Sequence, residues 1–136
     1  MSFPTVDGLR TMELGLAGSS RAHLNDLVIN GQKRATAGLL SEYAEENEPW
    51  EQVGERLVLV DDDMNVLGTI EITRVEPTTF GEVTWEFAQA EAEGMADVAA
   101  WQEQHHEFWA RTGESVADDT GVLCIYFDLL PQPESD

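Results

Sequence analysis

Residues 119–130, DTGVLCIYFDLL, form the stretch that most restricts how this chain can fold. The stretch has the length of a strand, contains β-branched and aromatic residues, and is almost continuously apolar. This pattern predicts a strand that is buried on both faces. Cys124 lies within the stretch, and we expect it to be a small buried core residue rather than a catalytic thiol.

Two further strands are predicted at residues 55–63 and 64–80, because both stretches carry β-branched residues. The turn Asp61-Asp62-Asp63 is expected to join them as a hairpin through local hydrogen bonds. It lacks the glycine and the further carboxylates that a calcium loop requires at set positions. Pro77 is predicted to end the second strand.

The apolar spacing of residues 21–30 predicts a short amphipathic helix. Ser19 or Ser20 is available as its N-cap, and Gly31 is its stop signal. Residues 37–48 are compatible with a second helix, which the following proline ends.

The longest helical pattern spans residues 83–112. Thr84 can cap its first part, Gly94 interrupts it, and Gly113 ends it. The tail 131–136 is expected to be loose. Strands in the middle and at the end of the chain, with helices between them, indicate an α+β fold with a small sheet or barrel.

The length of 136 residues predicts one domain, with its core at about residues 12–130. No run of 18 apolar residues exists, and the N-terminus lacks the basic and apolar regions of a signal peptide. The single cysteine fits a reducing compartment. We therefore expect a soluble, cytoplasmic protein.

A formal net charge of −20 is the strongest compositional feature. A field of that sign repels polyphosphate backbones and argues against tight binding to long duplex DNA or RNA. A small ligand, or a short nucleic-acid fragment at a local basic spot, stays compatible with it. The other interpretation is that the acidity serves solubility.

The stretch NGQKRAT, residues 30–36, holds the only lysine of the chain, Lys33, three residues before Thr36. That spacing brings the two side chains together on a helical turn or in a tight loop. A lysine beside a threonine can take the hydroxyl proton in acyl transfer, or as a cation it can hold an oxyanion or phosphate. The alternative is a solvated loop in which Thr36 caps a helix.

Other candidate side chains are weaker. Carboxylates in FAQAEAEG and upstream of it (Glu86, Glu91, Glu93) can orient a lysine or act as acid or base, but most glutamates on an acidic helix are solvated. Trp101 and His105 are four residues apart, so the two rings are expected to pack together. A metal ligand at His105 is not expected, since no cysteine or histidine cluster accompanies it. We find no P-loop, dinucleotide or zinc motif, and we expect no cofactor.

The order of these segments resembles that of bacterial ASCH-domain proteins of the PUA-like superfamily. The resemblance rests on ELGLAGSSRAHLNDLVINGQKRATAGLLSEY, NEPWEQVGERLVLVDDDMNVLGTIEITRVE, FAQAEAEG, WQEQHHEFW and GVLCIYFDLL, and it extends from about Met12 to Leu130. It implies a small PUA-like β-barrel with flanking helices, and a cleft at the G-x-K-x-x-T loop.

One branch of that family hydrolyses the acetyl amide of N4-acetylcytidine with a lysine, a threonine and a downstream glutamate. The resemblance assigns these catalytic roles to Lys33, Thr36 and Glu91, with Glu93 as the alternative glutamate. Two departures are that this chain is longer than those hydrolases and that Ala92 stands where they have glycine.

We therefore hypothesise that the protein binds a nucleoside, nucleotide or short RNA. In the enzymatic form of this hypothesis, the protein hydrolyses the amide of an N-acylated cytidine. The further ligand-binding candidates are Gly31, Arg34, Tyr43 and Glu93. In this form of the hypothesis, backbone N–H groups near Gly31 hold the oxyanion. Tyr43 and Trp50 are candidates to stack on a base, although core packing is the stronger expectation for Trp50. The alternatives are a non-enzymatic RNA-binding module and a ribonuclease.

Overall fold

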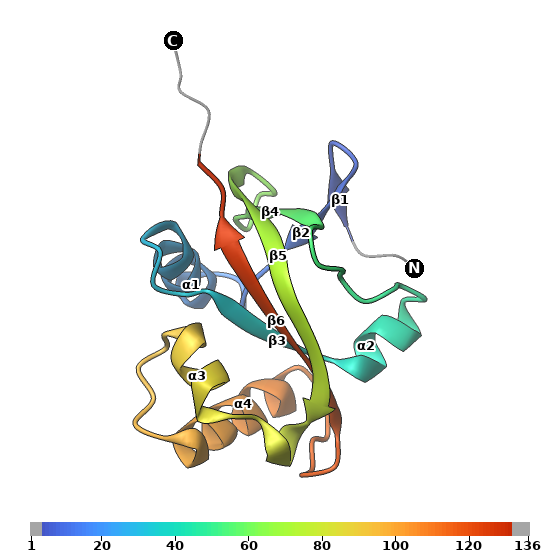
Figure 1. Ribbon diagram of the computed structural model, residues 1–136, viewed down its shortest axis with the longest axis vertical. Coiled ribbons are helices and arrows are strands. Elements are labelled where there is room, and N and C mark those ends of the chain that lie inside the picture. Colours follow the sequence, from blue (N-terminus) through green and yellow to red (C-terminus); the bar gives the residue numbers. More distant parts are fainter. Residues whose placement is uncertain (1–3, 132–136) are drawn as a thin grey trace.

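The computed structural model describes residues 4–131 and has a mixed α+β architecture (Figure 1). Its single six-stranded sheet has the order β1-β2-β4-β5-β6-β3. The strands are β1 Thr5–Val6, β2 Leu9–Met12, β3 Ala35–Leu39, β4 Arg56–Val60, β5 Val66–Thr79 and β6 Gly121–Leu129. The helices are α1 Ser19–Ile29, α2 Leu40–Glu45, α3 Trp85–Glu91 and α4 Val98–Arg111, with a 3₁₀ turn at Phe80–Glu82.

Strand β6 is buried on both faces, as its sequence predicts. Leu123, Ile125 and Phe127 enter one core cluster, which α1 covers. Val122 and Cys124 enter the other, which α3 and α4 cover. Because neighbouring residues of a strand point to opposite faces, this alternation places the two groups of helices on opposite sides of β6.

The hairpin of β4 and β5 is antiparallel, as predicted. The turn before β5 forms through Asp61, whose carboxylate accepts hydrogen bonds from the backbone N–H groups of Asp63 and Asn65 at 3.0 and 2.9 Å. The prediction that Pro77 ends the second strand is wrong, because β5 continues to Thr79 with Pro77 opposite Leu123. Within β5, only Val66–Glu71 pair with β4, so on that side Pro77 has no described strand to which it would need to donate a hydrogen bond.

Two further expectations need correction. The first three residues of the predicted helix 37–48 belong to strand β3, which pairs with β6 along its whole length, and only Leu40–Glu45 are helical. Here the tertiary pairing overrides a helix-compatible composition. Helix α1 begins at Ser19 with Gly18 as its N-cap, so neither serine caps it through its side chain.

The helical region 83–112 divides into α3 and α4, as predicted. The Thr84 side chain accepts a hydrogen bond from the Phe87 N–H and caps α3. Trp50 is 43% exposed, so the expectation that it packs in the core is wrong. Most of the tail predicted to be loose lies outside the described residues. Within the described residues, no helix combines the length and apolar character that crossing a membrane requires.

Candidate functional site

Lys33 lies on a loop between α1 and β3 that backbone hydrogen bonds hold in place. Gly31 has a positive φ of 79°, and its N–H donates to the Val28 carbonyl while the next N–H donates to Leu27. This is the Schellman pattern, which ends a helix at a glycine. The Arg34 N–H then donates to Ala90 at the end of α3 at 2.7 Å. The loop is therefore fixed to the segment that carries the candidate glutamates.

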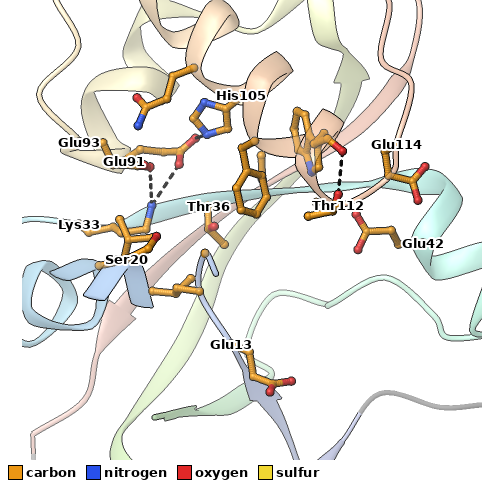
Figure 2. Close-up of a pocket in the computed structure, with 18 of the residues that line it drawn as sticks. Glu13, Ser20, Lys33, Thr36, Glu42, Glu91, Glu93, His105, Thr112 and Glu114 are labelled. Atoms are coloured by element: carbon orange, nitrogen blue, oxygen red, sulfur yellow. Dashed lines mark hydrogen bonds and ion pairs between the residues drawn. The ribbon is translucent and has the colours of Figure 1, made fainter. Parts of the chain in front are cut away.

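Lys33 is only 2% exposed and lies between two carboxylates. Its Nζ is 3.1 Å from Glu91 Oε2 and 3.2 Å from Glu93 Oε2 (Figure 2). A buried ammonium is stable only when it is paired in this way. The sequence prediction that a downstream glutamate reaches Lys33 thus corresponds to a direct contact, and both alternative glutamates contribute.

Glu91 is the centre of the cluster and is 1% exposed. Its Oε1 accepts a hydrogen bond from Trp101 Nε1 at 2.7 Å and lies 3.5 Å from His105 Nε2. Burial alone would raise the pKa of Glu91, but the Lys33 charge and the His105 contact outweigh burial and lower it. Glu91 is therefore ionised at neutral pH.

The pKa of Glu93 is shifted in the opposite direction. Burial, together with its hydrogen bond to Glu91, raises the pKa of Glu93 to about 7, against the attraction of Lys33. Two neighbouring carboxyl groups with separated pKa values are the arrangement in which one holds a proton while the other stays charged. Of the two carboxyl groups, Glu93 is thus the one that exchanges a proton near neutral pH.

Glu91, Glu93 and His105 are also the described residues that come together as potential metal ligands, with one ligand atom of each within 4.8 Å of the others. The spacing in sequence gave no reason to expect a metal at His105. The Lys33 ammonium already supplies a positive charge to both carboxylates. The arrangement fits a carboxylate-held lysine without requiring an ion.

A cleft of about 620 Å³ opens beside this cluster (Figure 2). Thr36, Ala37 and Gly38 of β3 form its floor. Among the described strands β3 pairs only with β6, so its opposite edge is left unpaired there. The β2–α1 segment and α4 also contribute lining residues. Seven glutamates line the cleft: Glu13, Glu42, Glu45, Glu46, Glu91, Glu93 and Glu114.

The cleft brings together the three candidate catalytic residues Lys33, Thr36 and Glu91, and also Glu93. It does not include Gly31 or Arg34, which line a second depression of about 380 Å³ that Lys33 also lines. Tyr43 is buried beneath Gly38, and its hydroxyl donates to Glu51 at 2.8 Å.

The backbone near Gly31 does not suit the oxyanion role proposed for it. The N–H groups of residues 31–34 all donate to carbonyls within the protein. Glu86, the remaining candidate carboxylate, is on the surface in an ion pair with Arg74.

Several lining residues had no sequence signal. Glu13, Glu42 and Glu114 come from distant segments and look like any other glutamate of an acidic chain. The contact of His105 with Glu91 was also missed, although the stacking of His105 on Trp101 was predicted from their spacing.

The family model of the ASCH domain matches residues 11–131. The crystal structure of an ASCH domain from Lactobacillus crispatus JV V101 has 28% identity and a TM-score of 0.77, over 88% of this chain and 77% of that one. A protein from Enterococcus faecalis V583 also has 28% identity and a TM-score of 0.77, over 87% of this chain and 74% of that one.

A third structure, of a hypothetical protein, has 14% identity and a TM-score of 0.55 over 77% of this chain and 89% of that one, which is a likeness of fold alone. No curated protein matches the chain significantly. Because the family model covers most of its length, the chain belongs to the ASCH domain family and has the PUA-like fold.

Proposed function

We propose that the cleft binds a small, uncharged nucleoside and hydrolyses an N-acyl amide on its base, as in an N4-acylated cytidine. The observation that carries this proposal is the contact of Lys33 Nζ with Glu91 Oε2 at 3.1 Å, in a cleft whose floor includes Thr36. A lysine, a threonine and a carboxylate in one cleft are the groups that acyl transfer through a hydroxyl nucleophile requires.

In the proposed reaction, Lys33 first passes one proton to the carboxylate of Glu93, whose Oε2 lies 3.2 Å from Nζ. As a neutral amine, Lys33 then accepts the hydroxyl proton while Thr36 Oγ1 attacks the acyl carbon. Glu91 holds the resulting ammonium. The C–N bond then breaks, and the base leaves as its amine after it receives a proton from Lys33. Water hydrolyses the acyl-threonine and releases a carboxylic acid. Ser20 and Gln104 line the same cleft and offer donors for the oxyanion.

The charge of the cleft supports an uncharged ligand. Lys33 is its only lysine or arginine, and both of that lysine's carboxylate partners lie within 3.2 Å. Five more glutamates line the remaining surface. A phosphate group would meet repulsion that a free nucleoside avoids. We therefore propose a nucleoside rather than a nucleotide as the ligand, and neither long duplex DNA nor a membrane as a partner. A cytoplasmic location belongs to the same proposal.

The test is release of cytidine from N4-acetylcytidine by the purified protein, followed by chromatography. We expect Thr36→Ala to abolish release and Thr36→Ser to retain part of it. Thr73→Ala, an exposed threonine of β5, is the matched control and should retain full activity. The 5′-monophosphate of the same substrate should react more slowly. Absence of turnover by the folded wild-type protein on all acylated cytidines would overturn the enzymatic proposal.

A second candidate is a non-enzymatic RNA-binding module, because ASCH domains are associated with RNA binding. It predicts salt-sensitive binding of structured RNA, lost in a variant of Arg34, which is exposed outside the cleft. The acidic lining of the cleft opposes it. A titration of short structured RNA against free nucleoside separates the two candidates.

A further inference from the structure

His105 is held in one orientation by Trp101. The two rings are stacked, with centroids 4.1 Å apart and planes 18° from parallel. The His105 Nδ1 is also 2.9 Å from the carbonyl oxygen of Trp101, one helical turn earlier on α4. Both contacts leave Nε2 directed at Glu91 Oε1, at 3.5 Å (Figure 2).

The position of the hydrogen on the ring follows from these contacts. A carbonyl oxygen only accepts hydrogen bonds, so Nδ1 must carry the hydrogen. In the neutral ring Nε2 then presents a lone pair to the carboxylate of Glu91, and the two repel. Only the imidazolium form, with hydrogen on both nitrogens, is attracted to Glu91.

Glu91 at the end of α3 and Glu93 after it are the charged groups that act on the ring. Glu91 in turn interacts with Lys33, which precedes β3, and with Cys124 on β6, where burial raises the pKa of the thiol to about 12. Glu91 is the group that contacts both Lys33 and His105, one through each carboxylate oxygen. A change in the ring is therefore transmitted to Lys33 through Glu91.

We infer that His105 is a positioning residue whose imidazolium form holds the Glu91 carboxylate against Lys33, so that the cleft loses its ordered lysine as the ring loses its proton. The inference concerns regulation of the proposed active site and rests on the proposed function only for its effect on turnover.

The direction of the pKa shift agrees with this geometry. Burial alone would lower the pKa of His105, but the contact with Glu91 and the charges of Glu91 and Glu93 raise it. The folded protein thus keeps the ring protonated to higher pH than an exposed histidine, and the contact with Glu91 is lost as pH rises through that raised value.

The test uses the lysine count of the chain. Because Lys33 is the only lysine, ¹⁵N-lysine labelling gives one Nζ signal, and the three histidines give three ring signals to follow against pH. We expect the Nζ signal of the wild type to broaden as the His105 ring, and not the other two, loses its proton. The ring signals are needed because Glu93 exchanges its proton in the same range.

Three variants separate positioning from packing. His105→Gln keeps an amide donor that does not titrate, so its Nζ signal should persist to higher pH than in the wild type. His105→Phe keeps a ring against Trp101 without a donor, so its signal should be broad throughout. His106→Gln, at the exposed neighbouring histidine, should behave as the wild type. The inference would be overturned if the Nζ signal did not change as His105 loses its proton. It would also be overturned if the Nζ line width were the same in His105→Gln and His105→Phe.

Turnover is measured separately, so the two proposals can fail independently. With N4-acetylcytidine, we expect the alkaline limb of the wild-type profile to fall by up to about tenfold per pH unit, as for loss of one proton, and to flatten in His105→Gln. If the Nζ signal behaves as expected but no hydrolysis is detected, only the proposed function is refuted. Hydrolysis with identical profiles in wild type and His105→Gln would refute the role of His105 alone.

Discussion

Two ionic clusters among the described residues, one buried and one partly buried, differ in what surrounds them. The Lys33 cluster consists of Lys33, Glu91, Glu93 and His105. The Arg10 cluster consists of Arg10, Tyr43, Glu48, Glu51 and Glu55. In the second, the Arg10 guanidinium contacts both oxygens of Glu55 at 2.8 and 3.0 Å and the carbonyl of Pro49 at 2.8 Å. Each cluster contains one lysine or arginine and more than one carboxylate, yet only the Lys33 cluster lines the cleft.

The choice of cation accounts for much of this difference. A guanidinium presents several fixed donors and stays charged, which suits a permanent link between β2 and the segment before β4. An ammonium is compact and can give up its proton, which suits chemistry. Burial of charge alone therefore does not identify a site, whereas a lysine held by carboxylates at the wall of a cleft makes the Lys33 cluster the candidate site.

The largest effect is expected from Lys33→Met. It leaves the carboxylates of Glu91 and Glu93 without a cation, and removing one partner of a buried pair costs about 3–5 kcal/mol of unfolding free energy. Urea unfolding measures the loss, and cytidine release should vanish. Lys33→Arg is the companion variant, which should recover stability but not turnover, because arginine does not give up its proton. An active Lys33→Arg protein would contradict the role of Lys33 as a base.

Arg10→Met should cost less, about 1–3 kcal/mol, because Glu55 keeps partial contact with solvent. The affinity for nucleoside, measured by calorimetry at a temperature where the variant is folded, should not change. A loss of affinity in the folded variant would show that the Arg10 cluster also affects the cleft and that the two clusters do not differ in this respect.

The fold and the candidate site differ in how much of each could be predicted from sequence patterns. The buried strand β6, the hairpin and the division between α3 and α4 were predicted because their signals are local. Residues 37–39 of β3 were mistaken for helix because their conformation depends on pairing with β6, more than eighty residues later. Lys33, Thr36 and Glu91 were named through a family resemblance, since nothing local links residues so far apart. The glutamates of the cleft and the contact of His105 with Glu91 depend on packing and could not be predicted.

Tyr43→Phe tests whether a residue of the Arg10 cluster affects ligand binding in the cleft. The hydroxyl of Tyr43 donates to buried Glu51 at 2.8 Å, and loss of a donor to a buried carboxylate costs about 1–2 kcal/mol. Chemical unfolding should show this loss. Because Tyr43 does not line the cleft, the nucleoside affinity should stay the same. Weaker binding at unchanged stability would instead support the ligand-binding role expected from the sequence.

The smallest effect concerns the dependence of stability on pH. The pKa of Glu93 is raised from 4.5 to about 7, so the folded state binds this proton more tightly than the unfolded state. The resulting stabilisation is fully present below pH 4.5 and is lost as pH rises through 7. Glu91 has the opposite sign, because its pKa is lowered, and its contribution is lost only as pH falls below 4.5.

Glu93→Gln removes this titration and leaves a neutral side chain at every pH. Between pH 6.5 and 8, we expect the wild type to lose about 0.8 kcal/mol more unfolding free energy than Glu93→Gln. Glu86→Gln, at an exposed glutamate of α3, is the matched control and should keep the slope of the wild type. Equal slopes in wild type and Glu93→Gln would mean that Glu93 is ionised throughout this range. The Lys33 ammonium would then face two full negative charges at neutral pH, and its role as a proton acceptor would have to be abandoned.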